Sequence, residues 1–132
     1  MDISSITENN RALVSGYITA VGQKQFNRLS EYLADDLEFS GPKSSLHSGP
    51  QYIKVLEKLG TILLQNDIKR IFVEGNEACV IYDFVTDTEV GIVPSVEWLK
   101  ISQGKISSIH LIFDRYRWEE VIEVMNRRVK KN

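Results

Sequence analysis

One stretch constrains the fold of this chain more than any other: Pro94 to Asp114, PSVEWLKISQGKISSIHLIFD, predicts two β-strands joined by a tight turn at Gln103–Gly104. Successive side chains of a strand point to opposite faces. One face of this hairpin is therefore apolar except for a single acid; its members are Glu97, Leu99, Ile101, Ile109, Leu111 and Phe113. A carboxylate in apolar surroundings needs a reason, and Glu97 is the first candidate functional residue.

The length and charge of the chain narrow the classes of function. With 132 residues, 42% of them hydrophobic, we expect one domain over residues 1–132. A net charge of −2 gives no broad attraction to nucleic acid or to anionic membranes, so neither is an expected partner. The absence of a bilayer-length apolar run and of a signal-peptide pattern predicts a cytoplasmic protein. A single cysteine and two distant histidines predict no metal site, and we expect no cofactor.

Helical periodicity fills the first half of the chain. Apolar residues at helical spacing predict helices over about 6–22, 26–34 and 50–65. Ser5 and Glu8 have the spacing of a capping box at the first helix, and Pro50 opens the third. Turn-forming residues over 41–49 predict a loop before that third helix.

Strand periodicity begins at Ile68, and all of the sheet is expected to follow the helices. A turn at Gly75–Asn76 precedes a long strand, and the opening hairpin comes next. The stripe from Trp118 to Met125 predicts a last helix that packs on the sheet edge or on a second subunit. These elements predict an α+β fold of three N-terminal helices packed in a curved antiparallel sheet, plus a short C-terminal helix. A twisted sheet of this kind leaves a pocket where its inner face is not filled.

Several short motifs follow one another in a characteristic order. After the helical pair come Ala34-Asp35-Asp36-Leu37-Glu38-Phe39, then Ser48-Gly49 at the third helix, then Gly104-Lys105-Ile106 between the last strands. Together, over about residues 6–114, they resemble the nuclear transport factor 2-like superfamily, which includes the SnoaL-like polyketide cyclases and the ketosteroid isomerases. The resemblance implies a cystatin-like cone whose curved sheet wraps the helices and encloses a mostly apolar pocket. It also implies dimers that form through the outer face of the sheet.

The resemblance assigns chemistry to particular positions. Set against the ketosteroid isomerases, Tyr17 falls on the helix-one tyrosine that donates to the substrate oxygen, and Glu97 falls on the strand acid that shares this work. The third position departs, because Gly41 before Pro42 stands where the isomerases carry their general-base aspartate. Steroid isomerisation by that mechanism is therefore not expected. Asp114 ends the last strand where several SnoaL-like proteins carry an aspartate near the pocket.

The candidate catalytic residues are thus Glu97, Tyr17 and Asp114. Burial would raise the pKa of Glu97 and suit it to act as acid or base, with Tyr17 donating to a developing oxyanion. The alternatives are that Glu97 is hydrated at the cone mouth or paired with a buried base, and that Tyr17 only packs. Strand alternation points Asp114 outward, where an ion pair with a neighbouring arginine would account for it. The candidate ligand-binding residues are Tyr52, Leu56, Tyr82, Phe84, Leu99, Leu111 and Phe113; a filled core is their alternative role.

The opposite face of the sheet predicts a homodimer. By alternation it carries Ile81, Trp98, His110 and Ile112, a large apolar patch for a monomer. His110 near Asp83 suits acid–base chemistry, but we expect an interface role. The sequence therefore predicts a SnoaL-like protein that binds a small hydrophobic ligand, with cofactor-free isomerase- or cyclase-type chemistry as the enzymatic option. A non-catalytic dimeric binding or interaction module with a filled cone is the alternative.

Overall fold

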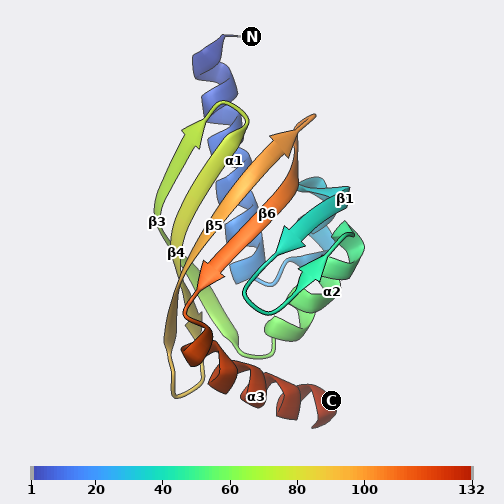
Figure 1. Ribbon diagram of the computed structural model, residues 1–132, viewed down its shortest axis with the longest axis vertical. Coiled ribbons are helices and arrows are strands. Elements are labelled where there is room, and N and C mark those ends of the chain that lie inside the picture. The colour runs from blue at the N-terminus through green and yellow to red at the C-terminus, as the bar shows by residue number, and fades with distance from the viewer. Residues whose placement is uncertain (1, 132) are drawn as a thin grey trace.

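A six-stranded sheet wraps around a long helix (Figure 1). The computed structural model describes residues 2–131. In chain order the elements are α1 (Ile3–Gly22), the 3-10 helix η1 (Phe26–Glu31), β1 (Leu33–Ser40), β2 (Ser45–Leu46), α2 (Gly49–Leu59), β3 (Leu63–Glu74), β4 (Glu77–Thr86), β5 (Ile92–Ser102), β6 (Lys105–Phe113) and α3 (Arg115–Lys131). The strand order is β2-β1-β6-β5-β4-β3. This is the predicted α+β cone, with one difference in strand direction described below.

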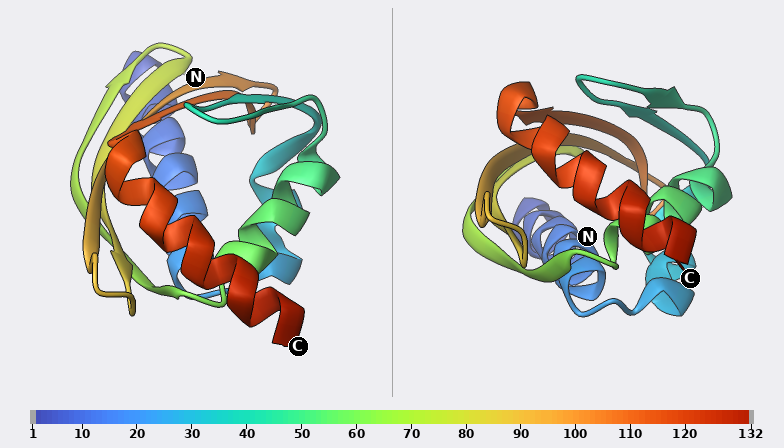
Figure 2. Two further views of the ribbon diagram at one scale, coloured as in Figure 1. Left: turned by 60° about the horizontal axis from the view of Figure 1, so that its bottom comes forward. Right: turned by 90° about the horizontal axis from the view of Figure 1, so that it is seen from below.

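The curvature of the sheet makes the cone. The sheet bends around α1, α2 lies on the open side beside β1, and α3 crosses one end of the cone (Figures 1 and 2). The buried side of α1 carries Val14, Tyr17, Ile18 and Val21, which recur at helical spacing. The concave face of the sheet is therefore covered by helices from three parts of the sequence.

The first two predicted helices differ from the observed ones. Asp2 caps α1 by accepting a hydrogen bond from the backbone N–H of Ser5 at 2.8 Å, so the predicted capping box is wrong. The second helix ends at Glu31 rather than near residue 34. Its C-terminal part is drawn into the sheet, because the backbone N–H of Ile106 donates to the carbonyl oxygen of Tyr32 and β1 then pairs with β6. Tertiary pairing here overrides local helical spacing.

The third predicted helix is too long. The helix α2 starts at Gly49, where the side chain of Ser48 accepts from the N–H of Gln51, and ends at Leu59. Ile62 and Leu63 continue the helical spacing, but they are buried in the turn and in the first residue of β3. Spacing alone cannot separate a buried strand start from a helix end.

The expectation that every strand follows the helices is also wrong. The strand β1 precedes α2 and runs parallel to β6, while the other neighbouring strands of the described chain pair antiparallel. The sheet is therefore mixed. The C-terminal helix α3 has 17 residues and is not short.

The hairpin of β5 and β6 is confirmed. Gln103 and Gly104 take positive φ angles of 53° and 76°, as a tight two-residue turn requires. Glu97 lies opposite Leu111 on the inner face, and Trp98 lies opposite His110 on the outer face. The sequence-based division of the two faces therefore holds at these positions.

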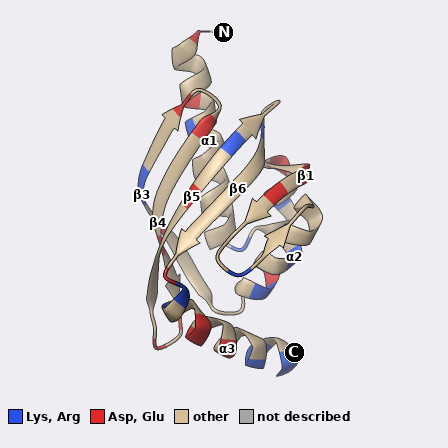
Figure 3. Cartoon of the chain, in the orientation of Figure 1, with Lys and Arg blue, Asp and Glu red and all other residues tan. Residues whose placement is uncertain are grey.

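Charged residues gather at the C-terminal end of α3 (Figure 3). Arg128 donates hydrogen bonds to the carboxylate of Asp87 at 2.6 and 2.8 Å and to the carbonyl oxygen of Thr61 at 2.7 Å. These bonds tie α3 to the β4–β5 turn and to the segment after α2.

Within residues 2–131, no helix combines the length and the apolar character needed to span a bilayer.

Candidate functional site

A cavity of about 190 Å³ lies inside the cone. Its walls come from all three α-helices, from β1, β3, β4, β5 and β6, and from the segment that follows β1, and most of the lining residues are apolar. The apolar members include Ile18, Val21, Phe39, Leu56, Leu59, Phe84, Leu111 and Phe113. Such a lining suits a small, mainly hydrophobic molecule.

Glu97 is the one acid that lines this cavity among the residues described. Its side chain projects from β5 and is only 2% exposed. Its Oε1 accepts a hydrogen bond from the hydroxyl of Tyr17 at 2.9 Å, and its Oε2 accepts one from the hydroxyl of Tyr82 at 2.5 Å. No lysine, arginine or histidine of the described chain forms an ion pair with it. Neither hydration at the mouth nor a buried base therefore accounts for Glu97.

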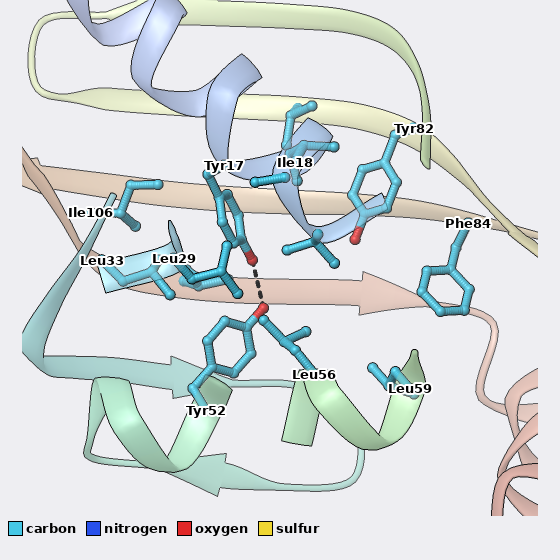
Figure 4. Packing of buried hydrophobic residues seen from close by; sticks show 14 of the residues in the cluster. Tyr17, Ile18, Leu29, Leu33, Tyr52, Leu56, Leu59, Tyr82, Phe84 and Ile106 are labelled. Carbon is cyan, nitrogen blue, oxygen red and sulfur yellow. Dashed lines mark hydrogen bonds between the residues drawn. The ribbon is translucent and has the colours of Figure 1, made fainter. Parts of the chain in front are cut away.

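A second tyrosine extends the hydrogen-bond chain. The hydroxyl oxygens of Tyr17 and Tyr52 lie 2.5 Å apart, and the hydroxyl of Tyr82 points to the same region (Figure 4). Because the Tyr17 proton is directed at Glu97, Tyr52 is the donor to Tyr17 in this arrangement. We call Tyr17, Tyr52, Tyr82 and Glu97 the Glu97 cluster. Its members come from α1, α2, β4 and β5.

Burial dominates the electrostatics of the Glu97 cluster. Loss of hydration raises the pKa of Glu97 from an ordinary 4.5 to about 7, although the hydrogen bonds from Tyr82 and Tyr17 lower it. Burial, followed by the nearby charge of Glu97, raises the pKa of each of the three tyrosines well above 10. Near neutral pH the tyrosines stay neutral, and Glu97 is the member of the cluster that gains or loses a proton.

Most predicted site residues meet in one place. The cavity is lined by Tyr17, Tyr52, Leu56, Tyr82, Phe84, Glu97, Leu111 and Phe113. Leu99 is different, because it is fully buried in the core and is not among the residues that line the cavity. It lies two positions nearer the β5–β6 turn than Glu97, where the inner face is filled by packed side chains. The structure therefore does not bring Leu99 to the cavity with the other predicted ligand-binding residues.

Asp114 does not join the other two catalytic candidates. Its side chain is exposed and lies outside the cavity lining. Its Oδ1 accepts from the backbone N–H of Tyr116 at 3.0 Å, and its Oδ2 is 3.9 Å from Nε of Arg117. This placement matches the alternative of a local ion pair at the start of α3.

Sequence reasoning missed the contribution of α3 to the cavity. Trp118, Ile122 and Met125 line it, and the Trp118 ring lies 4.8 Å from the ring of Phe113 and 5.4 Å from that of Phe84. The stripe was expected on the sheet edge or on a second subunit, and it packs instead against inner-face aromatics. Its helical spacing was visible in the sequence, but the direction of α3 relative to the cone was not.

Further polar groups at the cavity were also missed. Lys43, Asn66 and Ser95 line it, and Lys43 forms an ion pair with Glu119 at 3.4 Å. Gly41 lines it as well, so the position that holds the isomerase base presents no side chain here. Within residues 2–131, no group of three His, Cys, Asp or Glu side chains is placed to hold a metal ion.

The family model of the SnoaL-like domain matches residues 14–109. The chain therefore belongs to the SnoaL-like family, within the nuclear transport factor 2-like fold described above. Among curated proteins, no sequence matches that of this chain.

Solved structures share this fold. An NTF2-like protein of unknown function from Cytophaga hutchinsonii is 25% identical, with a TM-score of 0.70 over 80% of this chain and 89% of that one. A candidate SnoaL-like polyketide cyclase from Jannaschia sp. CCS1 is 16% identical, with a TM-score of 0.74 over 92% and 96% of the two chains. An LEH-like epoxide hydrolase from M. tuberculosis is 17% identical, with a TM-score of 0.73 over 96% and 98%. The last two likenesses concern the fold alone.

Proposed function

We propose that this protein binds a small hydrophobic organic molecule in its cone and performs proton-transfer chemistry of the isomerase or cyclase type without a metal or cofactor. One observation carries the proposal: a buried carboxyl group with a pKa of about 7 lies in the wall of an apolar cavity and is held by two tyrosine hydroxyls. A group with such a pKa exchanges protons readily near neutral pH.

The roles follow from the chemistry of each group. Glu97 removes or returns a proton on the bound molecule. While Glu97 holds that proton, a tyrosine hydroxyl of the Glu97 cluster donates to an oxygen on which negative charge develops. The aromatic side chains of Phe84 and Phe113 hold the apolar body of the ligand. Because Gly41 supplies no second acid, Glu97 is the one carboxyl group at the cavity among residues 2–131, and removal and return of the proton would use the same residue.

The protein is further proposed to be a homodimer in the cytoplasm. On the outer face of the sheet, Ile81, Trp98 and Ile112 are 37%, 48% and 52% exposed, and they form neighbouring positions on β4, β5 and β6. Contiguous apolar surface of this kind is typical of an interface. The same face supports the second candidate function, a non-catalytic dimeric module. The cavity favours the ligand-binding function, because a scaffold with a filled cone has no need of a buried carboxyl beside empty space.

A thermal-shift measurement with bicyclic ketones, phenols and hydrocarbons tests the ligand site. Compounds that enter the cavity raise the melting temperature of the wild type by mass action. In Leu111→Trp the larger ring fills the cavity, and the shift is lost. Leu64→Trp is the matched control, because Leu64 is 58% exposed and outside the cavity lining. No stabilisation of the wild type by any compound, or equal stabilisation of Leu111→Trp, contradicts the proposal.

A further inference from the structure

The protons of the Glu97 cluster can be counted. When Glu97 is ionised, the cluster has three hydroxyl protons, one on each tyrosine. Its three internal hydrogen bonds are Tyr52 to Tyr17, Tyr17 to Oε1 of Glu97, and Tyr82 to Oε2 of Glu97. Every proton is therefore directed inward. The ionised cluster has no donor left for a ligand, and it presents only acceptor oxygens to the cavity.

One added proton reverses this polarity. A proton taken from water onto Oε1 of Glu97 turns the carboxyl into a donor to the oxygen of Tyr17. The Tyr17 hydroxyl then rotates to donate to Tyr52, and the Tyr52 hydroxyl rotates toward the cavity that it lines. The O–H bond of Glu97 forms as a hydronium ion in the solvent gives up its proton and becomes water, and no other covalent bond changes. The protonated cluster thus has one donor in excess of its internal bonds.

The surplus donor emerges at Tyr52 rather than at Tyr82. Among residues 2–131, Tyr17 is the only hydrogen-bond partner of the Tyr52 hydroxyl, so nothing in that part of the chain competes for its proton. Tyr82 lies beside Ser95, whose own hydroxyl donates to the carbonyl oxygen of Val93. The oxygen of Ser95 is then free to accept from Tyr82. A proton added on that side would be taken up within the wall.

In the described part of the chain, no other charge at the cavity compensates for that of Glu97. The groups that face Glu97 are Tyr17 from α1, Tyr52 from α2 and Tyr82 from β4, and all of them are neutral near pH 7. Lys43 is the basic residue of the described lining, and its ammonium group pairs with Glu119. A change in the charge of Glu97 therefore requires the exchange of a proton with solvent.

We propose that the Glu97 cluster takes up one proton when it binds a molecule with an acceptor oxygen, such as a carbonyl, and that the Tyr52 hydroxyl is the donor to that oxygen. This inference rests on the proposed ligand site. The relay runs from Glu97 through Tyr17 to Tyr52. Tyr17 then acts through Tyr52 and is a positioning residue. The ligand class is a small apolar molecule with a carbonyl oxygen at one end.

Titration calorimetry with a matched pair of probes tests this inference. The probes are 1-indanone, which has a carbonyl oxygen, and indane, the same skeleton without it. Each is titrated into the wild type at pH 6 and pH 8 in two buffers of different ionisation enthalpy. At pH 8 we expect 1-indanone to take up close to one proton per molecule bound and indane to take up none, because Glu97 is then largely ionised in the free protein. At pH 6 both uptakes approach zero.

The affinity for 1-indanone should follow the same linkage. Above the pKa of Glu97, the affinity for 1-indanone falls about tenfold per pH unit, because one proton is taken up for each molecule bound. The affinity for indane stays constant. Measurement on the wild type alone is therefore decisive, whatever the stability of the variants.

Two tyrosine variants locate the donor. In Tyr52→Phe the terminal donor is lost, and at pH 6 the affinity for 1-indanone falls about tenfold while that for indane holds. In Tyr17→Phe the relay is broken, but the Tyr52 hydroxyl no longer donates to Tyr17 and is free to donate to the ligand. Binding of 1-indanone then persists and loses its pH dependence. A merely structural role of Tyr17 does not predict this outcome. Tyr82→Phe is the control inside the cluster and keeps the uptake when the titration is made above the raised pKa of Glu97 in that variant.

The outcomes separate this inference from the function it rests on. Binding of both probes without proton uptake at pH 8 overturns the inference and leaves the ligand site standing. Uptake that survives in Tyr52→Phe overturns the assignment of the donor. If neither 1-indanone nor indane binds at any pH, the proposed ligand site is overturned, and the inference with it.

Discussion

The hydroxyl of Tyr17 donates a 2.9 Å hydrogen bond to Oε1 of Glu97, although the two residues are 80 positions apart in the sequence. The bond joins the buried side of α1 to the inner face of β5. It also satisfies part of a carboxyl group that has almost no contact with solvent. Stability and site chemistry are therefore linked through one titrating side chain.

This link predicts how stability depends on pH. The pKa of Glu97 is about 7 in the folded protein and near 4.5 when unfolded, so the folded state binds more protons between these values. The free energy of unfolding therefore falls as pH rises through this range, and the contribution of Glu97 is complete below pH 4.5 and lost above pH 7. A shift of this size corresponds to about 3 kcal/mol. Urea unfolding at pH 4.5 and pH 8 measures the change.

Glu97→Gln supplies the control for that measurement. Its amide does not titrate, so the component of about 3 kcal/mol disappears while the contributions of the other acids remain. An identical pH dependence in the wild type and in Glu97→Gln contradicts a raised pKa for Glu97.

The hydrogen bond from Tyr82 predicts a second effect on the same carboxyl group. Donation from Tyr82 to Oε2 favours the ionised form and lowers the pKa of Glu97. In Tyr82→Phe we expect that pKa to rise above its wild-type value of about 7. Carbon-detected NMR titration of the glutamate side chains follows it directly.

Tyr52→Phe is the matched comparison, because Tyr52 reaches Glu97 only through Tyr17. It should move the titration midpoint of Glu97 less than Tyr82→Phe does. A midpoint that falls in Tyr82→Phe would show that this hydroxyl does not stabilise the carboxylate.

Local sequence pattern was enough to find the interior of the sheet. Strand alternation places Glu97 and Tyr82 on the inner face and Trp98 on the outer face, and the structure agrees because a pleated strand has a fixed period of two. The Glu97 cluster itself depends on the relative positions of α1, α2 and the sheet. The resemblance to the ketosteroid isomerases indicated Tyr17, whereas the direct contacts with Tyr52 and Tyr82 had to come from the structure.

Long-range pairing decided the features that the sequence misjudged. The residues after Glu31 have helical spacing, yet they pair with β6, because the strand hydrogen bonds are made with residues 70 or more positions away. The same holds for α3, whose apolar stripe was recognised but whose partner was not. A period identifies a buried face, but it carries no information about which surface covers it.

Trp118→Ala tests the observed position of α3. Trp118 packs against Phe84 and Phe113, so its removal leaves both rings uncovered and enlarges the cavity. We expect a loss of about 2 kcal/mol in the free energy of unfolding, below the range for a fully buried tryptophan because part of the ring is exposed. Chemical denaturation gives the value.

Tyr116→Ala is the control on the same helix, since Tyr116 is 84% exposed. It should change the free energy of unfolding by less than about 0.5 kcal/mol. Equal effects of the two substitutions would mean that α3 is not held against the cavity in solution.

The outer face of the sheet leads to the last prediction. Trp98 is 48% exposed, and its neighbour across the strand pair is His110, whose ring lies 6.3 Å away. Burial of this surface against a second copy would remove apolar area from water on both subunits. Light scattering should therefore give the wild type a mass of twice 15.1 kDa. In Trp98→Glu the mass should fall to that of one chain, because a carboxylate at the centre of the interface is costly to bury.

Tyr116→Glu introduces the same charge at an exposed position on α3, away from the sheet face, and should leave the dimer intact. The comparison separates loss of the interface from a general effect of added charge. A monomeric wild type, or a dimer that persists in Trp98→Glu, would refute the interface. Since Trp98 points away from the cavity, ligand binding should be the same in the two charged variants. The predicted interface at Trp98 and the cavity at Glu97 then lie on opposite faces of β5, so dimerisation and ligand binding can be tested independently.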